Sequence, residues 1–176
     1  MTHHSRSFPF FHRERESLLL DLLCGAAGGA LGTWLMSPVL QGVSKVMPQK
    51  LQGQGEQQEE GATAKLARKV LEPFGIELQG EQKKKAGNLV HYGYGIAWGA
   101  IYGVLHRRGP FVGKLFGLGF GLGLFLFGDE FLVPALKLGA PPQKTPLATH
   151  LSALAAHFTY GGVTEGSYRL LRRAFA

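Results

Sequence analysis

The chain has 176 residues, which is long enough for one compact unit and too short for two ordinary domains. Its formal net charge is +7, but no nucleic-acid-binding motif accompanies the basic residues. Nucleic acid is therefore excluded as a partner, and anionic lipid is expected instead. The hydrophobic share of 45% is ordinary for a globular protein, yet charged residues avoid four long stretches of the chain.

These four stretches predict helices that cross a membrane. Residues 22–44, 86–106 and 145–164 contain no Asp, Glu, Lys or Arg. The third stretch in chain order, 115–128, is shorter than the roughly 20 apolar residues that a bilayer-spanning helix needs. It reaches that length if Lys114 extends its ammonium group to the interface, or if the helix continues toward residue 136. We therefore expect transmembrane helices at 18–43, 88–107, 111–136 and 146–172.

Two alternatives to this architecture fit the pattern less well. Residues 115–127 read LFGLGFGLGLFLF and have no polar side chain, whereas a helix on a soluble protein shows a polar face every 3.6 residues. Arg13 and Arg15 precede the first stretch as in a signal peptide. Its apolar run continues to Val43, however, beyond the roughly 7–15 residues of a signal-peptide core. We predict an all-α integral membrane bundle of four transmembrane helices.

Two polar segments lie outside the expected spans. Residues 1–16 form a basic polar tail ahead of the four-helix transmembrane domain, 17–176. Residues 45–85 form a long polar loop between spans one and two. Within this loop, ATAKLARKVL at 62–71 places its leucines and Val70 against Lys and Arg at helical spacing. This pattern predicts a short interfacial helix.

Small residues recur at helical spacing along the expected spans. Lipid removes the hydrophobic drive that joins helices in water, so close backbone contact has to replace it. Gly95, Gly99 and Gly103 follow at intervals of four, and Gly117 and Gly121 repeat that interval in span three. We expect these glycines to lie at helix–helix contacts. The Gly-x-Gly run of span three is not a nucleotide loop, because it has no preceding strand and no Lys-Ser/Thr ending.

Ionisable residues inside the spans are the candidates for function, because placing such groups in a membrane is costly. An up-and-down topology brings the start of span two close to the end of span three and the start of span four. Three interpretations of the resulting cluster stay open: interhelical hydrogen bonding, a proton or ion relay, and a metal or haem site at His91, His150 and His157. We expect no cofactor under the first two. The polar intramembrane cluster consists of His91, Asp129, Glu130, His150 and His157.

A second polar cluster is expected in the opposite leaflet, with Asp21, His106, Glu165 and Arg169. Glu165 and Arg169 are four residues apart on one helix, so they can form an ion pair. Most arginines flank the spans on the side that holds both termini. We therefore expect cytoplasmic termini.

Three sequence blocks carry a resemblance to a known family. They read VHYGYGIAWGAIYG at 90–103, GDEFLVPALKLGAPP at 128–142 and THLSALAAHFTYGGVTE at 149–165. In these blocks the chain resembles the YagU-like family of small bacterial inner-membrane proteins of unknown function. The resemblance implies a multi-pass protein of the bacterial cytoplasmic membrane, and it implies no reaction. The positions that match the family pattern are His91, Tyr92, Gly93, Asp129, Glu130, Pro134, Pro141, His150, His157, Tyr160 and Glu165.

No serine or cysteine stands in a nucleophile-elbow context, and we predict that the chain is not an enzyme. The leading hypothesis is an accessory or scaffold subunit of a larger membrane complex, in contact with lipid and with other membrane subunits. Its basis is that small-residue faces on every span exceed what one bundle needs for its own packing. The alternative hypothesis is a protein that translocates protons or a solute through the His/carboxylate cluster.

Overall fold

The computed structural model describes residues 9–51, 60–109 and 112–175, and the regular structure in these ranges is entirely helical. The predicted all-α class is confirmed for these residues. Short 3-10 segments connect the longer elements: η1 (Gln49–Leu51), η3 (Glu72–Phe74), η4 (Lys114–Gly117) and η6 (Pro142–Lys144). A π-helix, η5 (Phe125–Leu132), joins α4 to α5. The α-helices are α1 (Pro9–Val46), α2 (Ala62–Leu71), α3 (Gly80–Arg108), α4 (Leu118–Leu124), α5 (Val133–Ala135) and α6 (Leu147–Phe175).

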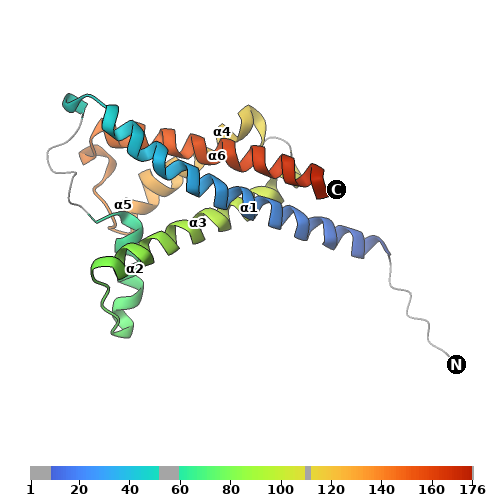
Figure 1. The fold of residues 1–176 in the computed structure, drawn as a ribbon, viewed down its shortest axis with the longest axis horizontal. Helices are drawn as coiled ribbons and strands as arrows, with labels where there is room; N and C mark the ends of the chain where they lie inside the picture. The colour runs from blue at the N-terminus through green and yellow to red at the C-terminus, as the bar shows by residue number, and fades with distance from the viewer. Residues whose placement is uncertain (1–8, 52–59, 110–111, 176) are drawn as a thin grey trace.

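The three long helices form the body of the bundle. α1 packs along both α3 and α6, and α4 packs against α6. Figure 1 shows α1 and α6 running in opposite directions, so that the start of α1 and the end of α6 lie at the same end of the bundle. The short helix α2 lies at the other end, against the start of α3. The elements therefore follow one another up and down along the bundle.

Glycines line the contact between α1 and α3. A Cβ atom at Gly99 would lie 2.7 Å from the Cα of Gly29, and one at Gly103 would lie 3.4 Å from the Cα of Gly25. A Cβ atom at Gly95 would lie 3.5 Å from the carbonyl oxygen of Gly29. The two backbones approach this closely because hydrogen is the only side-chain atom between them. The structure thus places these three α3 glycines at a helix–helix contact.

A second glycine contact joins α4 to α6. A Cβ atom at Gly161 would lie 2.9 Å from the backbone nitrogen of Gly121 and 3.1 Å from the carbonyl carbon of Gly117. Gly119 and Gly123 lie on the other side of this helical segment, and a Cβ atom there would have no neighbour within 4 Å. Alternate glycines of the Gly-x-Gly run therefore face the bundle and the outside.

The third expected span, 111–136, is not the continuous α-helix that was predicted. Regular α-helix begins at Leu118, because Leu115 and Phe116 before it have left-handed φ angles of 56° and 54°. The helix then widens into η5. Glycine lowers helix stability by about 1 kcal/mol relative to alanine, so this glycine-rich segment has little intrinsic preference for a regular α-helix. Phe111, where the span was expected to begin, lies outside the described residues.

The other helices run beyond the expected bounds. α1 begins within the predicted tail 1–16, α3 begins eight residues before position 88, and α6 continues past position 172. α2 occupies the residues that the sequence pattern indicated. Residues 1–8 of the expected tail and 52–59 of the expected loop lie outside the described part of the chain.

Two segments are long and apolar enough to cross a membrane, Ser17–Val46 and Lys114–Ala135. Large apolar side chains are also exposed on α3 and α6, as they are on these two segments. Exposed apolar surface spread over every long helix is typical of a face that contacts lipid. The outward-facing side chains include Leu19, Leu23, Trp34, Leu89, Ile96, Ile101, Leu122, Leu126, Phe131, Leu147, Leu151 and Leu170.

Candidate functional site

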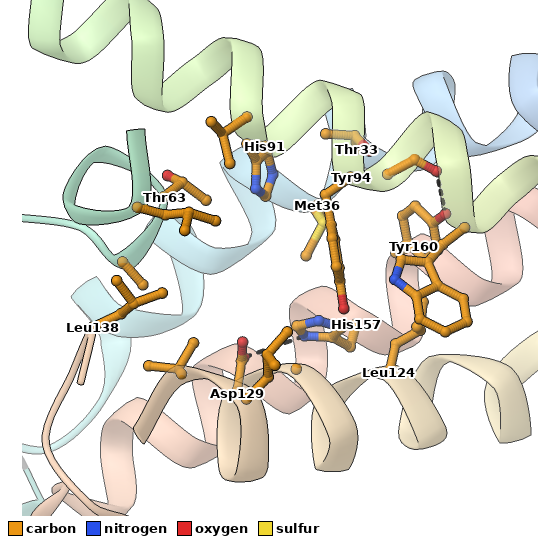
Figure 2. Close-up of a pocket in the computed structure, with 18 of the residues that line it drawn as sticks. Thr33, Met36, Thr63, His91, Tyr94, Leu124, Asp129, Leu138, His157 and Tyr160 are labelled. Atoms are coloured by element: carbon orange, nitrogen blue, oxygen red, sulfur yellow. Dashed lines mark hydrogen bonds and ion pairs between the residues drawn. The ribbon is translucent and has the colours of Figure 1, made fainter. Parts of the chain in front are cut away.

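A cavity of about 140 Å³ lies between α1, α2, α3, η5 and α6. Its volume is close to the roughly 150 Å³ of an engineered protein cavity that binds benzene. Figure 2 shows the side chains of these elements arranged around it. The walls are mainly apolar and include Met36, Leu66, Val90, Leu124, Leu132 and Leu138.

Polar side chains interrupt the apolar walls, among them His91, Tyr94, Asp129 and His157. Nδ1 of His157 lies 2.9 Å from the carbonyl oxygen of Ala153 and 3.6 Å from Oδ2 of Asp129. The shorter distance identifies the carbonyl as the hydrogen-bond acceptor, and the longer one is too great for a hydrogen bond. The Tyr94 hydroxyl is buried and has no hydrogen-bond partner among the described residues. Figure 2 shows it directed toward His157 and Asp129, with the ring of His91 extending into the cavity from the same helix, α3.

The π-helix positions Asp129 at the edge of this cavity. A π-helix contains an extra residue per turn relative to an α-helix, so it changes the direction of the side chains that follow, and such turns recur at functional sites. Gly128 lines the cavity next to Asp129. A Cβ atom at Gly128 would have a single neighbour within 4 Å, the Tyr94 hydroxyl at 3.4 Å. The backbone of η5 therefore leaves open space beside the carboxylate.

Aromatic rings form one wall of the cavity. The rings of Tyr94 and Trp98, one turn apart on α3, have centroids 6.0 Å apart at an angle of 67°. Trp98 also contacts the ring of Phe127, with centroids 5.9 Å apart. The hydroxyl of Tyr160 donates to the carbonyl of Gly95 at 2.6 Å, so this hydroxyl is already engaged. Of the tyrosine hydroxyls that line the cavity, that of Tyr94 is therefore the one left for a ligand.

The short helix α2 covers one side of the cavity. Thr63 and Leu66 face inward and line it. Ala64 packs on Gly87 of α3, where a Cβ atom would lie 3.0 Å from the Cβ of Ala64. Nζ of Lys69 donates to the carbonyl oxygen of a residue just after α5, Leu136, at 2.8 Å. These contacts hold α2 over the cavity, against α3 on one side and against the residue that follows α5 on the other.

The structure divides the five-residue cluster expected from the sequence. Oε1 of Glu130 lies 2.6 Å from Nδ1 of His150, and Nε2 of His150 lies 3.1 Å from the carbonyl oxygen of Pro142. Neither Glu130 nor His150 lines the cavity. Asp129 and Glu130 are adjacent in a helix, and adjacent side chains point in different directions. His91, Asp129 and His157 therefore share the cavity, and Glu130 with His150 forms a separate pair.

The arrangement does not fit a metal or haem site at His91, His150 and His157. In the ranges that the structure describes, no three side chains of His, Cys, Asp or Glu converge closely enough to hold a metal ion. His150 belongs to the outer pair with Glu130, whereas the other two histidines line the cavity. For all three histidines to bind one metal ion or haem, His150 would have to leave its contact with Glu130.

The second expected cluster forms two networks, of which the first surrounds Glu165. This carboxylate is 1% exposed. It accepts a hydrogen bond from the hydroxyl of Tyr102 and forms an ion pair with Arg169. Nε2 of His106 lies 3.5 Å from Oε2 of Glu165. The network joins α3 to α6 at the end of the bundle away from α2.

Asp21 forms the other network, on α1. Its Oδ1 accepts hydrogen bonds from the hydroxyl of Tyr168 at 2.8 Å and from Nε of Arg172 at 2.5 Å. Nη1 of Arg107 lies 3.9 Å from Oδ2. The ring of Tyr168 stands 4.7 Å from that of His106, between centroids, and this contact connects the two networks. Asp21 and Glu165 thus have separate partners rather than one common ion pair.

The sequence pattern placed Tyr94 near His91 and Asp129, but it did not identify Trp98, Tyr102 or Tyr168 as neighbours of the polar groups. Tyr94, Trp98 and Tyr102 each precede one of the packing glycines of α3, so the glycine repeat carries a parallel aromatic repeat. That repeat was the signal that could have identified them. Tyr168 and Arg172 follow Glu165 at helical spacing on α6, but their contacts with α1 depend on the helix packing and are not visible in the pattern.

Comparison with protein families gives one match. A model of the family described as "Protein of unknown function (DUF1440)" matches residues 62–165, more than half of the chain. The chain belongs to the DUF1440 family. The matched range includes every cavity-lining residue of this DUF1440 protein except Thr33 and Met36. No curated protein and no solved structure matches the chain.

Proposed function

We propose that this DUF1440 protein is a four-span membrane protein that binds a small solute in its cavity and passes it across the bilayer. The observation that carries the proposal is the buried Tyr94 hydroxyl, which is directed into the cavity and has no hydrogen-bond partner among the described residues. A buried polar group without a partner costs about 1–3 kcal/mol, so such a group calls for an explanation. A bound solute would satisfy it.

Four spans are consistent with how polar residues are distributed on α3 and α6. These helices carry Tyr102, His106 and Glu165. The Tyr102 hydroxyl donates to Glu165 inside the bundle, and Nε2 of His106 lies 3.5 Å from the same carboxylate. Ionisable groups within a membrane face the bundle interior and pair there, which lowers the mean hydropathy of a helix without exposing the groups to lipid. The outward faces of both helices carry exposed leucine and isoleucine. We therefore propose α1, α3, the α4–η5–α5 segment and α6 as the spans.

The bacterial cytoplasmic membrane is the proposed location, with both termini in the cytoplasm. The start of α1 and the end of α6 lie at one end of the bundle (Figure 1), and α3 ends there with Arg107 and Arg108. Arg172 and Arg173 lie in the last turn of α6. Arginine at the ends of spans favours the cytoplasmic side. We likewise propose that the protein is bacterial and that it is one of the YagU-like proteins.

An accessory or scaffold role remains a second candidate. Gly119 and Gly123 are four residues apart, face outward and have open space above them. Small residues at this spacing allow the close approach of another membrane helix. Most other span glycines are occupied by contacts within the bundle, so the geometry favours the cavity as the functional site. Under this second candidate, Gly123→Leu should reduce the size of a complex extracted in mild detergent.

Solute entry into proteoliposomes tests the first proposal. Light scattering would follow volume recovery after a hyperosmotic jump with choline chloride, glycerol or sodium acetate. We expect the protein to speed recovery for at least one of these probes. Gly128→Leu, which fills the cavity, should remove the effect, while Gly123→Leu, on the outward face of the same segment, should keep it. Equal recovery with wild type, with Gly128→Leu and without protein, for all three probes, contradicts translocation.

A further inference from the structure

We infer that the solute of this cavity is a small organic cation, held by the carboxylate of Asp129 and the aromatic faces of Tyr94 and Trp98. The inference rests on the proposed function and names the chemical class of its solute. It follows from the charge of the lining, from the engagement of the neighbouring basic groups and from the size and aromatic character of the walls.

The lining contains one carboxylate and no permanent cation. Asp129 is that carboxylate, and the lining contains no Lys or Arg. His91 and His157 are the two imidazoles that share the cavity with it. The Asp129 side chain is 38% exposed, so a ligand that enters the cavity can reach its carboxylate. A cation there can pair with this carboxylate through a charge-assisted hydrogen bond or an ion pair.

The neighbouring basic groups donate their hydrogen bonds to backbone carbonyls. Nδ1 of His157 donates to the carbonyl of Ala153 at 2.9 Å and lies within ion-pair distance of Oδ2 of Asp129, at 3.6 Å. Lys69, on the helix that covers the cavity, donates its ammonium to the carbonyl oxygen of Leu136. Neither group donates a hydrogen bond to Asp129, so its carboxylate oxygens remain available to a cationic ligand.

The walls limit the size and chemistry of that cation. The volume of about 140 Å³ admits one molecule of about the size of benzene. The rings of Tyr94 and Trp98 line the cavity. A cation within about 6 Å of a ring centroid is attracted by the negative face of an aromatic ring. The remaining walls are apolar and suit methyl or methylene groups. A compact alkylammonium ion combines these features, and choline is a suitable probe of the class.

The sequence provides a fluorescent reporter for binding. Of its two tryptophans, Trp98 lines the cavity and Trp34 is 60% exposed on α1 outside it. In Trp34→Phe protein, emission therefore reports on Trp98 alone. We would titrate this variant in detergent with choline and with the uncharged alcohol in which a quaternary carbon replaces the choline nitrogen. The two probes have nearly the same shape, so a difference in affinity measures the contribution of charge.

We expect choline to bind at least about tenfold more tightly than the uncharged alcohol. Asp129→Asn in the same background should abolish this preference, whereas Glu130→Gln, next in sequence but outside the cavity, should change it less than about twofold. Equal affinity for the two probes overturns the cationic class and leaves the solute cavity standing. Failure of both probes to bind overturns the solute cavity as well. If Asp129→Asn does not fold, the comparison of the two probes on Trp34→Phe protein decides alone.

Discussion

The hydroxyl of Tyr102 on α3 donates a hydrogen bond to the carboxylate of Glu165 on α6, and the two residues are 0% and 1% exposed. This bond crosses the bundle between two helices whose backbones make few direct contacts. Arg169 pairs with the same carboxylate from one turn further along α6. A fully buried acid is thus held by a donor from each helix, which fixes their relative rotation.

Removing the Tyr102 hydroxyl should destabilise the bundle. Tyr102→Phe leaves the buried carboxylate short of one donor, which costs about 1–3 kcal/mol. Thermal unfolding in detergent, followed by circular dichroism, should show a clearly lower Tm. Tyr92→Phe on the same helix is the control, because no hydrogen bond of the Tyr92 hydroxyl is found in the described ranges. Equal Tm values for the two variants would show that the Tyr102–Glu165 bond contributes nothing measurable.

Asp21 should contribute comparably at the same end of the bundle. Asp21→Asn removes the negative charge to which Arg172 and Tyr168 donate hydrogen bonds. We expect the free energy of unfolding to fall by about 1–3 kcal/mol, and no further, because Arg172 can still reach water. Glu81→Gln provides the contrast. Glu81 pairs with Lys84 at an exposed site, and its substitution should change stability by less than about 0.5 kcal/mol. If Asp21→Asn is as stable as Glu81→Gln, the buried network is not a source of stability.

Glycine substitutions on α3 should separate the packed face from the open face. Gly99→Ala places a methyl group 2.7 Å from the Cα of Gly29, and we expect a loss of about 1–3 kcal/mol. Gly93→Ala meets no atom within 4 Å, so it should be neutral or stabilising by up to about 1 kcal/mol through its helix preference. Thermal aggregation in detergent compares the two. Similar behaviour of both variants contradicts the close contact of α1 with α3.

The proposed four-span topology predicts which positions a labelling reagent reaches from each side of the membrane. In a Cys24→Ala background, single cysteines at Arg173 and Arg108 should react from one side of the membrane. Cysteines at Lys45 and Glu81 should react from the other side, since α1 ends and α3 begins there. An impermeant maleimide applied to sealed vesicles distinguishes the sides. Labelling of Arg108→Cys and Glu81→Cys from the same side would show that α3 does not cross.

Sequence patterns identified the helices well and their internal irregularity poorly. The charge-free stretches located α1, α3 and α6, because close packing of the bundle selects apolar and small residues over whole helices. The π-helix at Phe125–Leu132 and the left-handed Leu115 and Phe116 have no such signature. Both depend on how the glycine-rich segment settles against α6, which is a tertiary effect.

The sequence predicted the position of each polar residue along the bundle, but it did not predict which side chain each one contacts. Up-and-down topology brought His91, Asp129 and His157 to one cavity, since depth along a helix can be counted from the sequence. It could not separate Asp129 from Glu130, because adjacent residues differ in direction and the π-helix alters that direction. Which tyrosine contacts each polar group depends on how the helices are rotated about their axes. Counting residues along the chain does not reveal this rotation.

Access to the cavity is the most direct test of the account. Thr63 on α2 lines the cavity, whereas Glu77, after α2, is exposed outside it. In a Cys24→Ala background, a small water-soluble thiol reagent should modify Thr63→Cys, and choline should slow that modification in proportion to its occupancy. Modification of Glu77→Cys should proceed at the same rate with and without choline. A Thr63→Cys rate that is unchanged by choline, and unchanged by the cavity-filling Gly128→Leu, would contradict the claim that this cavity binds the solute.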